Sequence, residues 1–338
     1  MNDVIIIAEA GVNHNGNLDI AKELIKVAAK AGCDYVKFQT FIAKNVVSPS
    51  APKADYQSKN TGTDGSQIAM LEKLQLTFEQ HYDLITQCEV NNIKFFSTAF
   101  DLESIDFLKS LKMGIWKIPS GEITNLPFLE KIGAFNEQVI LSTGMATMEE
   151  ISDAISVLLK TGTQKHNITI LHCNTDYPTA FEDVNLNAMA HIKSEFNTNV
   201  GYSDHTLGIE VPIAAVALGA TIIEKHFTIN REMDGPDHKA SLEPDELKEM
   251  VKSIRHISNA LGSGQKKPSE SELKNREIAR KSIHIKKALS QGHILTEDDL
   301  IMKRPGNGIS PMVWRSIIGK SLRVDVQDDH LLLETDIK

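Results

Sequence analysis

The chain has 338 residues, of which 41% are hydrophobic and 24% are charged, so it can bury a substantial core. A formal net charge of -9 argues against a general nucleic-acid-binding protein, because such proteins usually carry a basic face. The three cysteines, Cys33, Cys88 and Cys173, lack CxxC spacing, which argues against a disulfide framework and a thiolate zinc site. No apolar stretch approaches the ~18 residues of a membrane span, and no basic signal-peptide region opens the chain. We therefore expect a cytoplasmic protein with neither membrane nor nucleic acid as a partner.

Short apolar runs rich in β-branched residues predict eight strands. They cover residues 4–10, 35–40, 93–99, 115–120, 138–144, 168–174, 199–204 and 221–227. Amphipathic stretches with helical spacing lie between them, and capping boxes at Thr77 with Gln80 and Thr147 with Glu150 predict two helix starts. Alternating strands and helices require parallel strands with helical crossovers. The pattern predicts an α/β fold, a (β/α)8 TIM barrel, with a doubly wound open sheet as the alternative.

The predicted barrel occupies residues 1–262 and closes with a helix over residues 244–261. A stretch rich in Gly, Ser, Pro and Lys follows, which predicts a linker over residues 263–281. Residues 282–338 contain strand-like runs at 282–285, 322–326 and 330–333 around the turn signal RPGNG. They predict a separate small domain, and one of this size usually needs a partner surface to be stable.

The connection between Thr40 and Thr77 is far longer than a usual strand-to-helix loop. In a barrel, such a connection lies on the C-terminal face, where active sites are built. We therefore expect it to cover the active site.

Polar side chains follow nearly every predicted strand, and in a barrel those strand ends converge on one cavity. His205 and His226 end neighbouring strands, so their imidazoles can approach each other closely enough to bind Mn, Fe, Zn or Co. The alternative is that each is an ordinary hydrogen-bonded polar residue.

Cationic and hydroxyl side chains at these ends suit an anionic substrate. The set that could hold a phosphate and a carboxylate is Lys37, Thr98, Lys117, Ser120 and Ser203. The alternative is that the lysines form interior ion pairs with Glu9 or Glu122. Glu122 itself could move protons or serve as a helix N-cap partner.

Blocks along nearly the whole chain carry a family resemblance. They include IIAEAGVNHNG, VKFQT, APKADYQSKNTG, FSTAFD, WKIPSGE, ILSTGMAT, ILHCNTDYPT, GYSDHT, EKHFT and KRPGNGISP. In this order they resemble the sialic acid synthase family, that is, N-acetylneuraminate synthase and its nonulosonate relatives. The tail resembles the family's antifreeze-like (SAF) domain. The resemblance implies a (β/α)8 barrel followed by that small C-terminal domain.

The same resemblance implies a metal-assisted enzyme that condenses phosphoenolpyruvate with N-acetylmannosamine and water, giving N-acetylneuraminate and phosphate by C–O cleavage. The alternative within the family is an N,N'-diacetyllegionaminate synthase that uses 2,4-diacetamido-2,4,6-trideoxymannose. The APKADYQ block occurs in both subgroups, and the blocks as a whole resemble the N-acetylmannosamine users slightly more. Rivals from other classes are an aldolase-type barrel with a lysine Schiff base and a protein whose tail binds ice or carbohydrate.

Residue roles carry over from the family by position. The metal, expected to be Mn²⁺ with Mg²⁺ or Co²⁺ as alternatives, matches His205 and His226. Phosphoenolpyruvate contacts match Lys37, Thr98, Lys117, Ser120 and Ser203, and sugar contacts match Gln39, Phe100, Glu122, Tyr177, Asp237 and Arg304. The residues implied in catalysis are Glu122, His205 and Arg304, the last delivered by the partner's tail in a domain-swapped homodimer. A family asparagine falls on Thr175, with Asn174 beside it, so that contact stays open.

Overall fold

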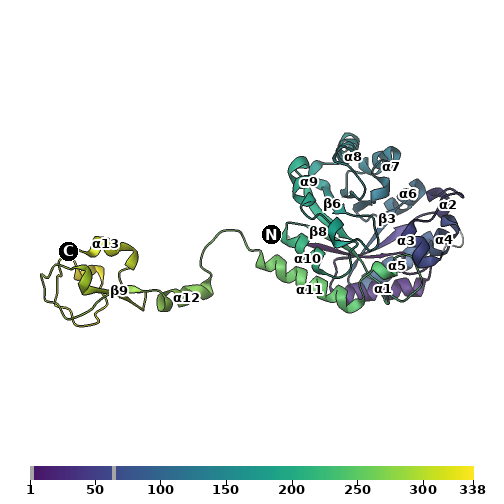
Figure 1. Ribbon diagram of the computed structural model, residues 1–338. Helices are drawn as coiled ribbons and strands as arrows, with labels where there is room; N and C mark the ends of the chain where they lie inside the picture. Colours follow the sequence, from purple (N-terminus) through teal and green to yellow (C-terminus); the bar gives the residue numbers. More distant parts are fainter. Residues whose placement is uncertain (1–3, 63–65) are drawn as a thin grey trace. The chain divides into compact units, whose positions relative to one another are not determined.

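A computed structural model describes residues 4–62 and 66–338 of the chain. Backbone contacts divide the chain into two compact units, Met1–Ser263 and Gly264–Lys338 (Figure 1). Every helix among the described residues is too short or too polar to cross a membrane.

The first unit is built on eight parallel strands. They are β1 (Ile5–Gly11), β2 (Tyr35–Thr40), β3 (Lys94–Ala99), β4 (Ile115–Ile118), β5 (Gln138–Ser142), β6 (Ile168–Cys173), β7 (Asn199–Asp204) and β8 (Ile222–His226). Ladders join them in the order β3-β2-β1-β8-β7-β6-β5-β4, and β3 lies beside β4 without a ladder in the described residues. The predicted barrel is confirmed in a nearly closed form. The open-sheet alternative is wrong, because β3 and β4, which end the ladder order, lie beside each other and bring the sheet back on itself.

Eight helices follow the strands and cover the sheet (Figure 1). They are α1 (Leu18–Ala31), α5 (Phe78–Val90), α6 (Leu102–Ser110), α7 (Leu126–Gly133), α8 (Met148–Thr161), α9 (Ala188–Phe196), α10 (Glu210–Ala217) and α11 (Pro244–Ala260). The two predicted capping boxes are present. Thr77 and Thr147 each accept a hydrogen bond from the backbone N–H three residues on, which starts α5 and α8.

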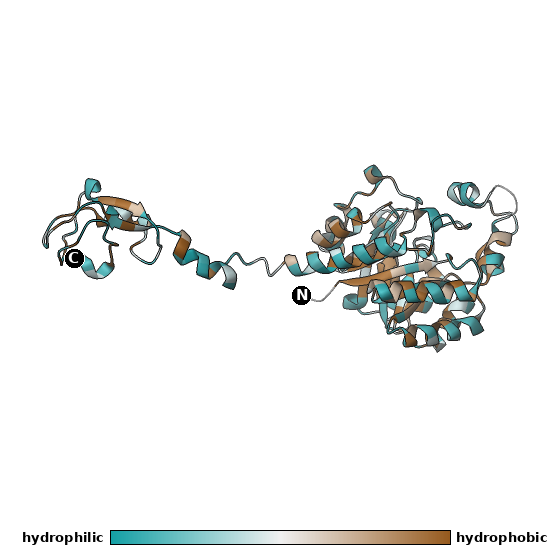
Figure 2. Cartoon of the chain, turned by 90° about the horizontal axis from the view of Figure 1, so that it is seen from below, coloured by the Kyte–Doolittle hydropathy of each residue, from teal (hydrophilic) through white to brown (hydrophobic). Residues whose placement is uncertain are grey.

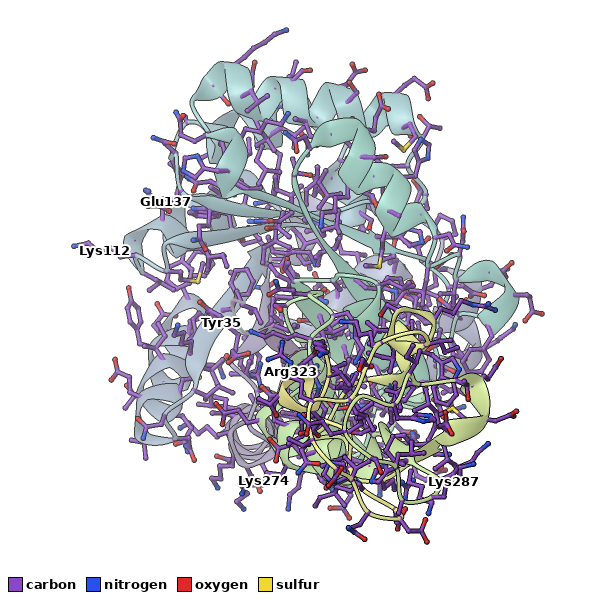
Figure 3. All side chains as sticks on the ribbon, turned by 90° about the vertical axis from the view of Figure 1, so that its left-hand side faces the viewer. Tyr35, Lys112, Glu137, Lys274, Lys287 and Arg323 are labelled. Carbon is purple, nitrogen blue, oxygen red and sulfur yellow. The ribbon has the colours of Figure 1, made fainter. Side chains whose placement is uncertain are left out.

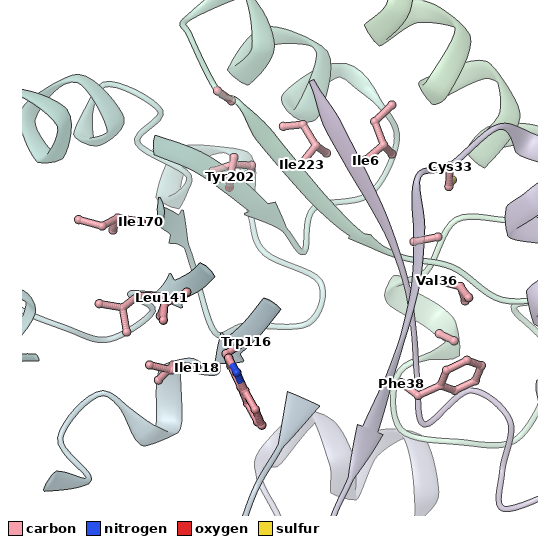
Figure 4. Close-up of a cluster of buried hydrophobic side chains, with 14 of the residues drawn as sticks. Ile6, Cys33, Val36, Phe38, Trp116, Ile118, Leu141, Ile170, Tyr202 and Ile223 are labelled. Atoms are coloured by element: carbon pink, nitrogen blue, oxygen red, sulfur yellow. The ribbon is translucent and has the colours of Figure 1, made fainter. Parts of the chain in front are cut away.

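Strand residues alternate between two apolar layers because successive side chains point to opposite faces. The outer layer packs against the helices and includes Ile6, Val36, Trp116, Tyr202 and Ile223 (Figure 4). The inner layer, which we call the barrel plug, consists of Ile7, Phe96, Ile115, Ile140, Leu171 and Ile222. Figure 2 shows the apolar strands at the centre of this unit and hydrophilic residues along the covering helices.

The end of the barrel near the N-termini of the strands carries partly exposed ion pairs. Glu137, labelled in Figure 3, accepts hydrogen bonds from Lys109 Nζ at 2.7 Å and from Trp116 Nε1 at 2.6 Å. Arg255 on α11 pairs with Asp34, with Nη2 and Oδ2 2.8 Å apart. These contacts fasten the ends of the strands to the helices.

The long connection after β2 contains three short helices, α2 (Ala43–Val46), α3 (Asp55–Thr61) and α4 (Gln67–Leu74). We call residues 41–62 and 66–76 the lid. Met70 and Leu74 on α4 pack with Val12 and Phe41 in a small apolar cluster of their own. The lid is therefore anchored to the barrel by buried side chains.

The second unit has a separate core, formed by Ile283, Ile285, Leu295, Leu300, Ile309, Ile317, Leu322, Val326, Leu332 and Ile337. Its antiparallel strands are β9 (Ser282–Ile285) and β10 (Leu300–Lys303), and it also contains α12 (Glu270–Ala279) and α13 (Trp314–Ile317).

Three expectations for this region need correction. The predicted strand at 282–285 is β9, but residues 322–326 and 330–333 form only isolated bridges, such as Leu289 with Val326 and His284 with Leu331. The partner of β9 is β10, which the sequence did not predict. The expected linker contains α12, which Ser269 starts by accepting a hydrogen bond from the N–H of Glu272.

Candidate active site

A cavity of about 290 Å³ opens at the C-terminal ends of the barrel strands. Strand residues form its floor, and lid residues such as Val47, Tyr56 and Leu71 form its other wall. The lid therefore covers the cavity, as predicted from the length of this connection.

The two-residue period of the strands explains which side chains form the floor of the cavity. Two positions after the plug residues Ile7, Ile115 and Ile222, the same strands carry Glu9, Lys117 and Glu224. Because alternate residues share a face, these charged side chains also point inward and lie above the plug. Their neighbours on the cavity wall include Lys37, Thr98, Ser120 and Ser203.

Glu224 lies between the two lysines. Lys117 Nζ donates to both its carboxylate oxygens, at 2.7 and 2.9 Å, and Lys37 Nζ lies 3.7 Å from its Oε2. Lys37 also pairs with Glu9 at 2.7 Å and donates to Thr98 Oγ1 at 2.9 Å. Two cations and two carboxylates thus form one buried network, and the alternative of an interior ion pair between Lys37 and Glu9 is realised.

The charges of this network depend on burial as well as on pairing. Burial alone would raise the pKa of Glu224, but Lys117 and Lys37 together hold it below its usual value. Burial raises the pKa of Glu9 to about 6, because Lys37 offsets only part of the lost hydration. Burial likewise lowers the pKa of Lys117, although Glu224 opposes that shift. An incoming anion would meet two lysine side chains that carboxylates already hold in place.

His205 and His226 face each other in the same cavity, with ring centroids 5.5 Å apart. His205 Nδ1 donates to the carbonyl oxygen of Asn174 at 2.5 Å, so in the neutral ring Nε2 keeps its lone pair free for a ligand. His226 Nδ1 is buried and has no hydrogen-bond partner among the described residues. Gly11 leaves room for this ring, because a Cβ there would lie 3.2 Å from His226 Cε1.

These two imidazoles fit a divalent metal ion. Burial lowers the pKa of both rings, and neutral rings are what metal binding requires. No group of three or more His, Cys, Asp or Glu side chains that could hold a metal occurs among the described residues. The remaining ligands would therefore be water or substrate.

The predicted sugar contacts Gln39, Phe100, Tyr177 and Asp237 also line the cavity. Asp237 is 6% exposed, and among the described residues its carboxylate has no hydrogen bond or ion pair. Burial and the nearby Glu9 raise its pKa to about 7. It is a polar group inside the cavity that a ligand hydroxyl could satisfy.

Two predicted residues are not among the cavity-lining set. Glu122 is half-buried just beyond Pro119–Gly121, and its Oε2 accepts a hydrogen bond from Asn125 Nδ2 at 2.6 Å. Its role as a catalytic and sugar-binding residue stays a prediction. Arg304 belongs to the second unit, where its Nε donates to Ala279 O at 3.0 Å.

Thr175 and Asn174, between which the family's phosphoenolpyruvate contact stayed open, have different surroundings. Thr175 lines the cavity, whereas Asn174 Nδ2 donates to Asp183 O at 2.8 Å. Asn174 instead orients His205 through its carbonyl oxygen.

Behind the two histidines, a fully buried ion pair joins β7 to β8. Lys225 Nζ lies 2.5 Å from Asp204 Oδ2, and both side chains are 0% exposed. Asp204 and Lys225 directly precede His205 and His226 in the sequence and face each other across the ladder. The pair therefore fixes the spacing of the two strand ends that carry the imidazoles.

Replacing Lys225 with Met should lower the free energy of unfolding by about 3–5 kcal/mol, because the buried Asp204 carboxylate would lose its cation. Urea unfolding measures this loss. The double variant Lys225→Met with Asp204→Asn, in which no charge remains unpaired, should recover much of it. An equally large loss in the single and double variants would contradict this account.

Comparisons with known proteins agree with this fold. The model of the NeuB family matches residues 24–266, and that of the SAF domain matches residues 280–338. The chain is 54% identical over 334 residues to N,N'-diacetyllegionaminic acid synthase of Campylobacter jejuni, covering 99% of this chain and 100% of that protein. It is 46% identical to the Legionella pneumophila protein of the same name, covering 97% and 93%. The crystal structure of N-acetylneuraminic acid (sialic acid) synthetase from Leptospira borgpetersenii is 35% identical and superposes with a TM-score of 0.71, covering 81% and 90%.

Proposed function

The chain belongs to the NeuB family of enzymes, and on that premise we propose that it is an N,N'-diacetyllegionaminic acid synthase. It would condense phosphoenolpyruvate with 2,4-diacetamido-2,4,6-trideoxymannose and water, releasing phosphate. The observation that carries this proposal is the pair of buried lysines around Glu224, next to the two imidazoles in one covered cavity.

The sugar is the point at which this proposal departs from the preference for N-acetylmannosamine drawn from the sequence blocks. Two relatives named as N,N'-diacetyllegionaminic acid synthases resemble this chain more closely than the sialic acid synthetase structure does. The overall similarity therefore favours 2,4-diacetamido-2,4,6-trideoxymannose, the alternative sugar that the sequence had left open.

The reaction we propose keeps atoms and charges in balance. C3 of phosphoenolpyruvate attacks the aldehyde carbon of the open-chain sugar and forms the new C–C bond, leaving cationic character at C2. Water adds to C2, and one of its protons passes to the oxygen of the former aldehyde. The C2–O bond to phosphate then breaks, the second proton leaves with phosphate, and C2 becomes a ketone. Lys37 and Lys117 would hold the anionic groups and stabilise the leaving phosphate, assisted by the hydroxyls of Thr98, Ser120 and Ser203.

His205 and His226 would hold a divalent ion, which we propose to be Mn²⁺, with Mg²⁺ or Co²⁺ as replacements. When bound, such an ion supplies Lewis-acid polarisation of the aldehyde oxygen. Asn174 orients His205 for this task, and Tyr177 packs against it with ring centroids 4.2 Å apart. Asp237 would accept a hydrogen bond from the sugar, and the lid would exclude bulk water.

The decisive experiment measures phosphate release from phosphoenolpyruvate and Mn²⁺ with each sugar in turn. We expect kcat/KM for the diacetamido sugar to exceed that for N-acetylmannosamine by at least about tenfold. A preference for N-acetylmannosamine would overturn the choice of sugar. No phosphate release with either sugar, or borohydride trapping of a lysine adduct, would overturn the condensation itself.

We further propose that the chain works as a domain-swapped homodimer in which Arg304 from the tail of one subunit completes the site of the other. Mixing Lys117→Met subunits with Arg304→Ala subunits tests this arrangement. Random exchange should restore about a quarter of wild-type activity, because half the dimers then contain one intact site. Inactive single variants that stay inactive after exchange would show that the tail does not act across subunits.

A further inference from the structure

The cavity has two chemically unlike walls. Its floor carries the lysines, carboxylates and imidazoles described above, whereas its lid wall, among the described residues, carries no charged side chain and is mostly apolar. We call this wall the apolar roof, and it consists of Val46, Val47, Met70, Leu71 and Leu74.

Packing and hydrogen bonds fix the apolar roof in place. Met70 and Leu74 are buried at 9% and 6% exposure in the lid's own apolar cluster. Gln75 Oε1 accepts a hydrogen bond from the N–H of Ala43 at 3.0 Å, which ties the helix after β2 to the end of α4. Asn60 Nδ2 donates to Pro236 O at 2.6 Å and joins α3 to the barrel. The apolar cluster and the Asn60–Pro236 hydrogen bond thus hold the roof to the barrel, and the Gln75–Ala43 hydrogen bond joins two parts of the lid.

The position of the reacting groups decides which end of the sugar meets this roof. The lysines and the imidazoles lie on the floor, so the aldehyde carbon of the sugar has to approach the floor. The opposite end of the sugar, from C4 to C6, then faces the lid. The two candidate sugars differ at that end, because N-acetylmannosamine has hydroxyls on C4 and C6 where the other sugar has an acetamido group and a methyl group.

We infer that the apolar roof selects a 6-deoxy, N-acylated hexose and rejects a hexose with free hydroxyls at C4 and C6. This inference rests on the proposed function and assigns its sugar specificity to named residues. A methyl group on C6 gains contact with aliphatic side chains, whereas a hydroxyl loses its hydration there without finding a partner.

One polar side chain of the lid wall suits the acetamido group. Gln67 lines the cavity, and its side-chain amide makes no hydrogen bond to another described residue. Gln57, by comparison, already has a partner, since its Oε1 accepts a hydrogen bond from the N–H of Ala54 at 3.0 Å. Gln67 can therefore both donate to and accept from an acetamido group, which has one carbonyl and one N–H.

Two lid variants test the inference. Val47→Thr replaces a methyl group by a hydroxyl at nearly constant volume, and Val47 lies outside the buried cluster of the lid. Leu71→Gln makes a larger change at a partly buried position. The quantity to measure is the ratio of kcat/KM for the diacetamido sugar to kcat/KM for N-acetylmannosamine. We expect this ratio to fall about fivefold in Val47→Thr and at least about tenfold in Leu71→Gln, with KM for phosphoenolpyruvate unchanged.

The matched control is Val90→Thr, the same substitution at a valine that is 76% exposed at the end of α5. It should leave the ratio unchanged. Lid variants that remain active with the same ratio as Val90→Thr would overturn the role of the roof while leaving the proposed function standing. A wild-type enzyme that uses neither sugar would overturn both.

Discussion

Replacing Lys117 with Met should lower kcat/KM for phosphoenolpyruvate by about 1000-fold, the scale expected when a preorganised charge contact is removed from a buried site. Lys117 is 4% exposed and donates to both oxygens of Glu224. Its loss removes one of the two cations available to the anionic substrate. It also leaves Glu224 paired mainly with Lys37, so the carboxylate would compete with the substrate for the remaining charge. Steady-state phosphate release measures the effect.

The chain offers a matched control for this substitution. Lys109 pairs with Glu137 at the same 2.7 Å separation, but its side chain is 38% exposed at the opposite end of the barrel. Lys109→Met should change kcat/KM by less than about twofold, because exposed pairs contribute little. A Lys117→Met enzyme that kept more than a tenth of wild-type kcat/KM would remove this lysine from the phosphoenolpyruvate site.

Replacing His226 with Ala should abolish the binding of Mn²⁺ at this site and lower activity by at least about 100-fold. A site with two protein ligands loses half of its fixed donors when one imidazole is removed. Electron paramagnetic resonance of free Mn²⁺ measures binding directly and does not depend on turnover. The fold should survive, because His226 Nδ1 forms no hydrogen bond among the described residues.

His191→Ala is the control, since His191 is an exposed histidine on α9. It should bind Mn²⁺ as the wild type does. Treatment with a chelator should make the wild type resemble His226→Ala, and added Mn²⁺ should restore activity only to the wild type. Undiminished Mn²⁺ binding by His226→Ala would move the metal to other ligands.

Much of this site was predictable because the strands have a two-residue period. Once residues 4–10 and 221–227 are assigned as strands, Glu9, Glu224 and His226 have to share a face with apolar plug residues. The order of the blocks then predicts that these side chains meet at one end of the barrel. The helix predicted over residues 244–261 is α11, and its buried residues Leu247, Met250, Val251 and Ile254 repeat at helical spacing.

Pairwise contacts across the barrel were not predictable in the same way. The two hydrogen bonds from Lys117 to Glu224 join residues 107 positions apart, and only the curvature of the closed sheet brings them together. Glu122 lies outside the cavity-lining residues for a local reason, and its predicted role stays a prediction. The chain turns into a short 3-10 helix at Ser120–Glu122, and Asn125 binds the Glu122 carboxylate.

The strands of the second unit were predicted less well, because its segments pair through isolated backbone bridges. Leu322 and Val326 each bond to a different segment through isolated bridges, so neither lies in a continuous ladder that a sequence pattern would indicate. The lid helices are short, and a four-residue helix such as α2 has too little periodicity to be recognised.

The barrel plug has a consequence for the order of events during turnover. Six packed aliphatic and aromatic side chains close the barrel beneath the charged floor. Substrates and products therefore enter and leave at the lid end of the cavity. With phosphoenolpyruvate held deepest by the lysines, as proposed, it has to load before the sugar above it. Its carbons leave in the new acid, and the phosphate that remains at the lysines has to depart last. A barrel closed at one end therefore gives ordered binding and release, and product inhibition by inorganic phosphate would be competitive with phosphoenolpyruvate.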